Sequence, residues 1–95
     1  MAGTIYDLNE TDILTRVTKY NLIRNGRMLH IDVHEALNGL LADAFVAVPN
    51  LISIVAKPEF QGVGETEELA LLDCLKKIKN IPLEDLMPSK KTPAT

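Results

Sequence analysis

The sequence predicts one small α+β domain, built as an antiparallel sheet of three to four strands with helices packed on one face. Three observations support this fold class. Two Asn-Gly pairs stand between alternating apolar residues, which is the strongest short-range signal for a β-hairpin. A later segment carries apolar residues at spacings of three and four, as an amphipathic helix does. The length of 95 residues suits a single domain.

The first Asn-Gly pair, Asn25-Gly26, predicts a two-residue turn between strands over residues 16–24 and 27–37. A type I′ turn needs positive φ at both central residues, and Asn and Gly accept this conformation most readily. The turn fixes the pairing of the two strands: Arg24 opposite Arg27, Leu22 opposite Leu29, Tyr20 opposite Ile31, and Lys19 opposite Asp32.

The second pair, Asn38-Gly39, predicts another two-residue turn and a third strand over residues 40–49, which completes a meander. Residues 35–37 would also suit a helical turn. The turn predicts Val33 opposite Ala44, Ile31 opposite Val46, and Leu29 opposite Val48. Both turns then give one shared apolar face, which a wrong register would scramble. Its members are Tyr20, Leu22, Leu29, Ile31, Val33, Ala44, Val46 and Val48.

Residues 51–56 are short and rich in β-branched residues, so they predict a fourth strand. Residues 60–64 form an extended link to a helix over residues 67–79. Thr66 is a good N-cap for that helix, and acidic residues follow it at the positive end of the helix dipole. The predicted core stripe of the helix comprises Leu71, Leu72, Leu75 and Ile78, with Leu69 and Cys74 beside it.

The two ends of the chain carry weaker signals. Residues 9–14 contain capping residues and predict a short N-terminal helix. Residues 88–95 are polar and bounded by prolines, which is typical of a disordered tail. We therefore expect one domain over residues 1–87 and a tail over residues 88–95.

Composition narrows the classes of partner and the compartment. The net charge is −3, and a strongly basic surface for nucleic acid is therefore not expected. One cysteine permits no disulfide within the chain, and the N-terminus does not resemble a signal peptide. No apolar stretch approaches the roughly 20 residues that span a bilayer. These features predict a cytoplasmic protein without a membrane partner.

Both histidines fall in one short segment, as His30 and His34 on either side of Asp32. On a strand all three side chains lie on the face opposite the core, where two of them with a further residue could bind a metal ion. The distance between His30 and His34 is roughly 13 Å along a straight strand, too far for one ion to bind all three. Cross-strand pairing with Lys19 and Asp43 is the simpler interpretation.

No other motif predicts catalysis or a cofactor. Gly62 and Gly64 precede a helix, but no lysine follows them and three glutamates would repel a phosphate. Cys74 falls near the apolar stripe of the helix, where a thiol is usually buried and unreactive. We therefore expect no cofactor, and the sequence favours a non-catalytic protein without deciding the question, because catalytic groups need not be close in sequence.

The segment from Gly62 to Ala70 resembles the strand-to-helix junction of double-stranded RNA-binding domains, which has Gly-x-Gly-x-Ser, two lysines, one residue and Ala. The expected order of elements also looks like the α-β-β-β-α layout of that family. Glu67 and Glu68 stand where the family has its two lysines, and this removes the basis for gripping phosphates. Residues 49–51 and 64–70 are similar to pieces of the HicB-type antitoxin domain. Both resemblances imply an α+β architecture.

The face of the sheet opposite the core is expected to mix apolar and polar residues, so it is a candidate interaction surface. We predict a non-catalytic module that binds itself or a protein partner through this face. The alternatives are metal or ligand binding at His30, Asp32 and His34, and RNA binding through Arg16, Lys19, Arg24 and Arg27. The predicted interaction residues are Val17, Lys19, Ile23, Met28 and Phe45, with Ala47 beside them.

Overall fold

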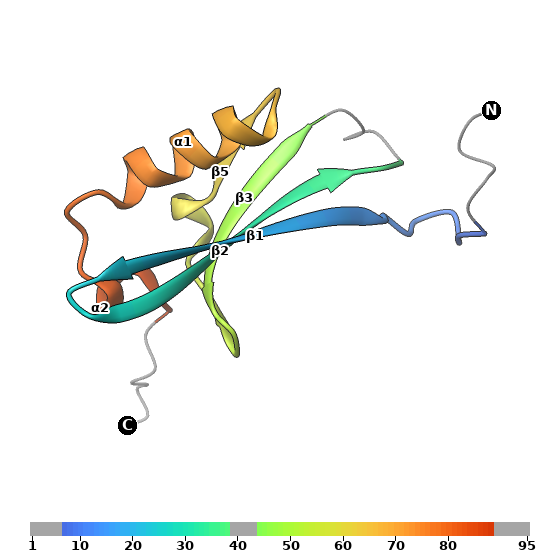
Figure 1. Cartoon of the computed structure of the whole chain (residues 1–95). Coiled ribbons are helices and arrows are strands. Elements are labelled where there is room, and N and C mark those ends of the chain that lie inside the picture. The colour runs from blue at the N-terminus through green and yellow to red at the C-terminus, as the bar shows by residue number, and fades with distance from the viewer. Residues whose placement is uncertain (1–6, 39–43, 89–95) are drawn as a thin grey trace.

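The computed structural model describes residues 7–38 and 44–88 and contains a five-stranded antiparallel sheet and two helices (Figure 1). The sheet order is β1-β2-β3-β4, and β5 pairs with β3 along the same edge as β4. The predicted α+β class is confirmed. In chain order the elements are β1 (Thr15–Arg24), β2 (Arg27–Ala36), β3 (Phe45–Leu51), β4 (Ile54–Val55), the 3-10 turn η2 (Pro58–Phe60), β5 (Gly62–Gly64), α1 (Glu67–Ile78) and α2 (Leu83–Leu86).

The first hairpin has the predicted turn and register. Asn25 and Gly26 have φ values of 52° and 79°, as a type I′ turn requires. All four predicted pairs are present in the β1–β2 ladder. Leu29, Ile31 and Val33 are almost completely buried on one face of β2.

The predicted register of the second hairpin is wrong. Val33 lies opposite Ala47 rather than Ala44, a displacement of three residues. Because an odd displacement turns every side chain to the other face, Ala47 and Pro49 face the core. Phe45 packs against the core as well, whereas Val46 and Val48 lie on the opposite face.

The cause lies in the connection between β2 and β3. The Asn38 side chain accepts a hydrogen bond from Leu14 N at 2.7 Å and donates one to Asp12 O at 2.9 Å. Asn38 thus anchors the segment before β1, and the link from Ala36 to Phe45 is longer than two residues. Gly39, the other half of the predicted turn, lies outside the described residues.

The predicted fourth strand is interrupted after Leu51. Ile52 has a φ of 51°, and the chain turns there between β3 and β4. Asn50 Oδ1 accepts a hydrogen bond from Ile52 N at 3.2 Å, an Asx-type contact that stabilises a tight turn.

The predicted link before the helix is strand β5, on which α1 packs closely. Gly62 is buried, and a Cβ atom there would lie within 3.0 Å of the backbone of Ala70 and Cys74. A Cβ on Gly64 would collide with the backbone of Ala70 as well. The two glycines therefore serve close strand–helix packing rather than phosphate binding.

Helix α1 begins as predicted, because Thr66 Oγ1 accepts a hydrogen bond from Leu69 N at 3.1 Å. Most of the predicted stripe is confirmed, because Ile78 is in the core and Leu71 and Leu75 pack against it; Leu72 is the exception. Ala70, Cys74 and Ile78 are completely buried, whereas Leu72 is 53% exposed. Because Ala70 and Cys74 have small side chains, α1 approaches β5 closely along them, and Leu72 lies on the exposed side of the helix.

Short helix α2 was not expected from the sequence. Leu83 and Leu86 are buried in the same cluster as Leu29 and Ile78, so both helices cover one face of the sheet. Residues 9–14 form a turn instead of the predicted helix. There Asp12 N donates to Asn9 O at 3.1 Å, and Asn9 N donates to the Asp12 carboxylate at 2.8 Å.

Residues 89–95 of the predicted tail lie outside the described residues. Within residues 7–38 and 44–88, no helix is long and apolar enough to span a bilayer.

Candidate functional site

The face of the sheet opposite the helices carries exposed apolar side chains. No helix of the described residues covers this face (Figure 1), which we call the open face. Val17, Ile23 and Met28 are 46%, 64% and 47% exposed, and Val55 and Val63 are 52% and 58% exposed. Three of these five residues, all in the first hairpin, were predicted from the sequence.

Strand pairing arranges the open face in rows that cross the strands. Four rows span the strands: apolar residues dominate the first and last, which we call the apolar end rows, and polar residues dominate the two between them. In order, the rows are Val17-His34-Val46-Val63, Lys19-Asp32-Val48, Asn21-His30-Asn50-Val55 and Ile23-Met28. The pair Thr15-Ala36 lies beyond the first row.

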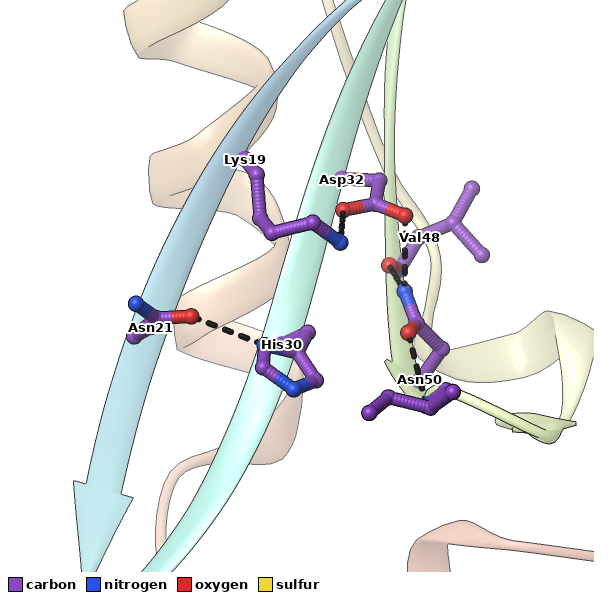
Figure 2. A network of polar contacts seen from close by, with 7 residues as sticks. Lys19, Asn21, His30, Asp32, Val48 and Asn50 are labelled. Atoms are coloured by element: carbon purple, nitrogen blue, oxygen red, sulfur yellow. Dashed lines mark hydrogen bonds and ion pairs between the residues drawn. The ribbon is translucent and has the colours of Figure 1, made fainter.

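A polar network connects the two middle rows (Figure 2). Lys19 Nζ lies 2.8 Å from Asp32 Oδ1, which confirms the predicted cross-strand pair. The second oxygen of Asp32 accepts a hydrogen bond from Asn50 Nδ2 at 3.1 Å. The network holds one positive and one negative charge, so it adds no net charge to the face.

The two histidines have separate partners. His30 Nδ1 donates to Asn21 Oδ1 at 2.8 Å (Figure 2), and His34 Nδ1 is hydrogen-bonded to Thr15 Oγ1 at 3.1 Å. Among the described residues, no group of three His, Cys, Asp or Glu side chains is placed to hold a metal ion. Asp43, which was predicted to pair with His34, lies outside the described residues. In the structure Val46 lies opposite His34.

The basic residues of the first hairpin do not form one patch. Arg16 and Arg27 form ion pairs with Glu35 at 3.4 Å and Glu84 at 3.2 Å. Lys19 belongs to the open-face network, whereas Arg24 points to the helix side. Its Nη1 donates to Ile78 O at 3.1 Å and to Ile81 O at 2.6 Å, and this caps the end of α1. This arrangement offers no continuous stripe for phosphates.

A surface pocket of about 390 Å³ lies where Arg24 meets the link between α1 and α2. Its lining is Arg24, Asn25, Lys79, Asn80, Ile81 and Pro82. The capping contacts of Arg24 give this region a structural role at the helix terminus.

The remaining reactive groups are occupied or buried. Cys74 is inaccessible, and burial raises the pKa of its thiol to about 11, so the thiolate nucleophile is scarce near neutral pH. The Tyr20 hydroxyl donates to Glu67, and this hydrogen bond raises the pKa of the phenol. The contact ties the start of α1 to β1 and thereby fixes the helix over the sheet.

Four open-face residues were not predicted from the sequence, and two residues were predicted on the wrong face. Phe45 and Ala47 face the core, whereas Val46 and Val48 lie on the open face. With the correct β3 register, alternation would have placed Val46 and Val48 on the open face and Phe45 and Ala47 on the core face. Val55 and Val63 sit on strands too short for alternation to show their orientation.

No protein-family model, curated protein or solved structure matches this chain. The resemblances to double-stranded RNA-binding domains and to HicB-type antitoxins therefore stay predictions, and the function has to be argued from the surface.

Proposed function

We propose that this protein is a non-catalytic interaction module that associates with a second copy of itself through the open face. The observation that carries the proposal is the set of apolar side chains, 46% to 64% exposed, on a sheet face that no helix of the described residues covers. Burial of these apolar side chains in a complex is favourable because it removes them from water.

The pattern of rows favours a second copy as the partner. A twofold axis in the interface, perpendicular to the strands, stacks each strand on its counterpart and places Val17 on Ile23 and His34 on Met28. Sheets that pack face to face in near alignment allow such a superposition.

The same axis brings the two polar rows together. Lys19 of one copy then faces Asn21 of the other, so an ammonium donor meets an amide oxygen that can accept from it. Polar groups at the centre thus find partners instead of being buried alone.

The mass of the purified protein in solution tests this proposal, by size-exclusion chromatography with light scattering. We expect twice the chain mass of 10.5 kDa or a larger even multiple. The variant Val63→Lys puts a charge on the open face and should lower the mass.

The matched control is Leu72→Lys, because Leu72 is 53% exposed on α1, away from the open face. It should leave the mass unchanged. A monomeric wild-type protein, or an equal effect of both variants, would contradict the proposal. A hetero-partner would then have to be sought for the open face.

A further inference from the structure

Strand β1 forms a long, regular edge of the sheet. It occupies the end of the strand order, and among the described residues it pairs with β2 alone. The ladder runs without a bulge from Thr15 opposite Ala36 to Arg24 opposite Arg27, and the strand contains no proline. Natural sheets protect such an edge with charged side chains, bulges, prolines or a covering element. β1 carries Arg16, Lys19 and Arg24, but Arg16 and Lys19 are ion-paired with β2. No bulge, proline or covering element occurs along β1 in the part of the chain that the structure describes.

The turn determines which peptide groups point outward. In a two-residue hairpin the residues that flank the turn form a hydrogen-bonded pair, and such pairs alternate along the ladder. Arg24, Leu22, Tyr20 and Thr18 therefore bond to β2. The intervening residues present their N–H and C=O groups to the outside: Val17, Lys19, Asn21 and Ile23. Within the described residues, none of these four makes a backbone hydrogen bond other than those of the strand ladders.

We infer that β1 pairs with β1 of a second copy, antiparallel and about a twofold axis that passes beside Tyr20. In this register Lys19 lies opposite Asn21 of the second copy, and Val17 lies opposite Ile23. Each of these pairs exchanges both of its N–H···O bonds, because all four residues present outward peptide groups. An isologous contact of this kind closes after two copies.

The neighbouring registers are less favourable. A shift of the twofold axis by one residue toward the N-terminus puts Lys19 opposite Lys19 and Val17 opposite Asn21, so the apolar pairing of Val17 with Ile23 is lost. A shift toward the turn puts Val17 opposite Asn25, which has a φ of 52° and cannot continue the ladder. The chosen register does place Arg16 opposite Arg24, a like-charge pair. Glu35 neutralises Arg16, and Arg24 is turned to the helix side, where it donates to Ile78 O and Ile81 O.

The edge contact extends the open face across both copies. Val17 of one copy lies next to Ile23 of the other, so the apolar end rows of both copies meet at the junction. The axis is perpendicular to the sheet and therefore compatible with the in-plane axis proposed above. Both contacts together give a tetramer of 222 symmetry, although each contact stands without the other.

A matched pair of variants at position 21 tests the edge contact. Asn21→Pro and Asn21→Ala both remove the bond from His30 to the Asn21 side chain, but only proline removes the outward N–H group. Proline is tolerated on an edge strand where its nitrogen faces outward, so circular dichroism should show a folded protein. We expect Asn21→Pro to halve the mass measured by light scattering and Asn21→Ala to keep it.

A disulfide provides a second test that does not depend on the proline variant. Val17 and Ile23 of one chain lie roughly 20 Å apart along the strand, too far for a disulfide. The double variant Val17→Cys/Ile23→Cys should therefore form a covalent dimer upon mild oxidation, whereas Val17→Cys alone should not. Cys74 is buried and should not interfere.

The outcomes separate the two proposals. Loss of mass in Asn21→Pro with no change in Val63→Lys supports the edge and refutes the open-face dimer. An unchanged mass in Asn21→Pro, an equal fall in Asn21→Ala, or no covalent dimer would overturn the edge contact. A monomeric wild-type protein would overturn both.

Discussion

Asn50 is the polar residue that joins the open face to the turn after β3. It is 6% exposed, and its amide makes three contacts: it donates to the Asp32 carboxylate and to Val48 O, and it accepts from Ile52 N. A buried amide with all these partners is stabilising, whereas its removal leaves partners unsatisfied. Asn50 thus helps to hold Ile52 in the left-handed region, which a β-branched residue rarely adopts.

Substitution of Asn50 should show this role. We expect Asn50→Ala to lower the free energy of unfolding by about 2 kcal/mol, because Ile52 N and Asp32 lose a buried partner. Asn50→Asp keeps the acceptor for Ile52 N but places a carboxylate beside Asp32, so it should be at least as destabilising at pH 7 and recover in acid. Urea unfolding at both pH values measures this. Equal stability of Asn50→Ala and wild type would contradict the assigned role.

Asp73 is the residue from which a pH dependence of stability is expected. Its carboxylate accepts a hydrogen bond from Val63 N at 3.0 Å and pairs with Lys77 Nζ at 3.1 Å. These contacts, the backbone bond first, lower the pKa of Asp73 below its ordinary value of 3.8. A lowered pKa stabilises the fold above the ordinary value, and this contribution is lost as the pH falls through the lowered pKa.

The variant Asp73→Asn isolates this contribution because it cannot titrate. Wild type should be more stable than Asp73→Asn at pH 7, and the difference should shrink as the pH falls below 3.8. Urea unfolding of both proteins at several pH values gives the difference directly. A difference that is constant from pH 7 to pH 2 would show that the carboxylate charge is not involved.

At the scale of elements, the packing of α1 on β5 depends on a missing side chain. Gly62→Ala should lower the free energy of unfolding by about 3 kcal/mol, since the new Cβ collides with helix backbone that cannot move aside. Gly26→Ala is the control: it has a φ of 79° but no atom within 4 Å of the new Cβ, so only backbone strain of about 1 kcal/mol is expected. Thermal and urea unfolding measure both, and equal losses would contradict the packing argument.

The two hairpins show what the sequence can predict about the elements and why it fails. Asn25-Gly26 acts through its own backbone preference, so the turn, the register and the buried face of β2 followed from local information. Asn38 is instead engaged by Leu14 and Asp12, residues more than twenty positions earlier. Such a long-range contact leaves no local signal, and the error displaced β3 by three residues.

The open face was predicted to the extent that it depends on the first hairpin. Val17, Lys19, Ile23 and Met28 lie where alternation from the first turn puts them. Phe45 depended on the wrong register and faces the core. In α1 the stripe was predicted except for Leu72, because the glycines of β5 bring Ala70 and Cys74 against the strand and leave Leu72 exposed.

At the scale of the whole molecule, the sheet is covered on one face only. The helices bury Leu29, Ile31 and Val33, whereas the other face keeps its apolar end rows exposed within the described residues. A domain of this size buries a smaller share of its surface on folding than a large domain does. Association would therefore bury apolar surface that the isolated chain leaves exposed. The folded chain should for this reason be more stable in the assembly than alone.

This coupling gives a prediction about the molecule as a whole. The melting temperature of the wild-type protein should rise with protein concentration, because a complex that binds only folded chains stabilises them by mass action. The double variant Asn21→Pro/Val63→Lys lacks both proposed contacts, so its melting temperature should be independent of concentration. Differential scanning fluorimetry over a hundredfold range of concentration measures both proteins. A concentration-independent wild-type melting temperature, together with a monomeric mass, would mean that the chain folds without help from a second copy and that the open face belongs to a different partner.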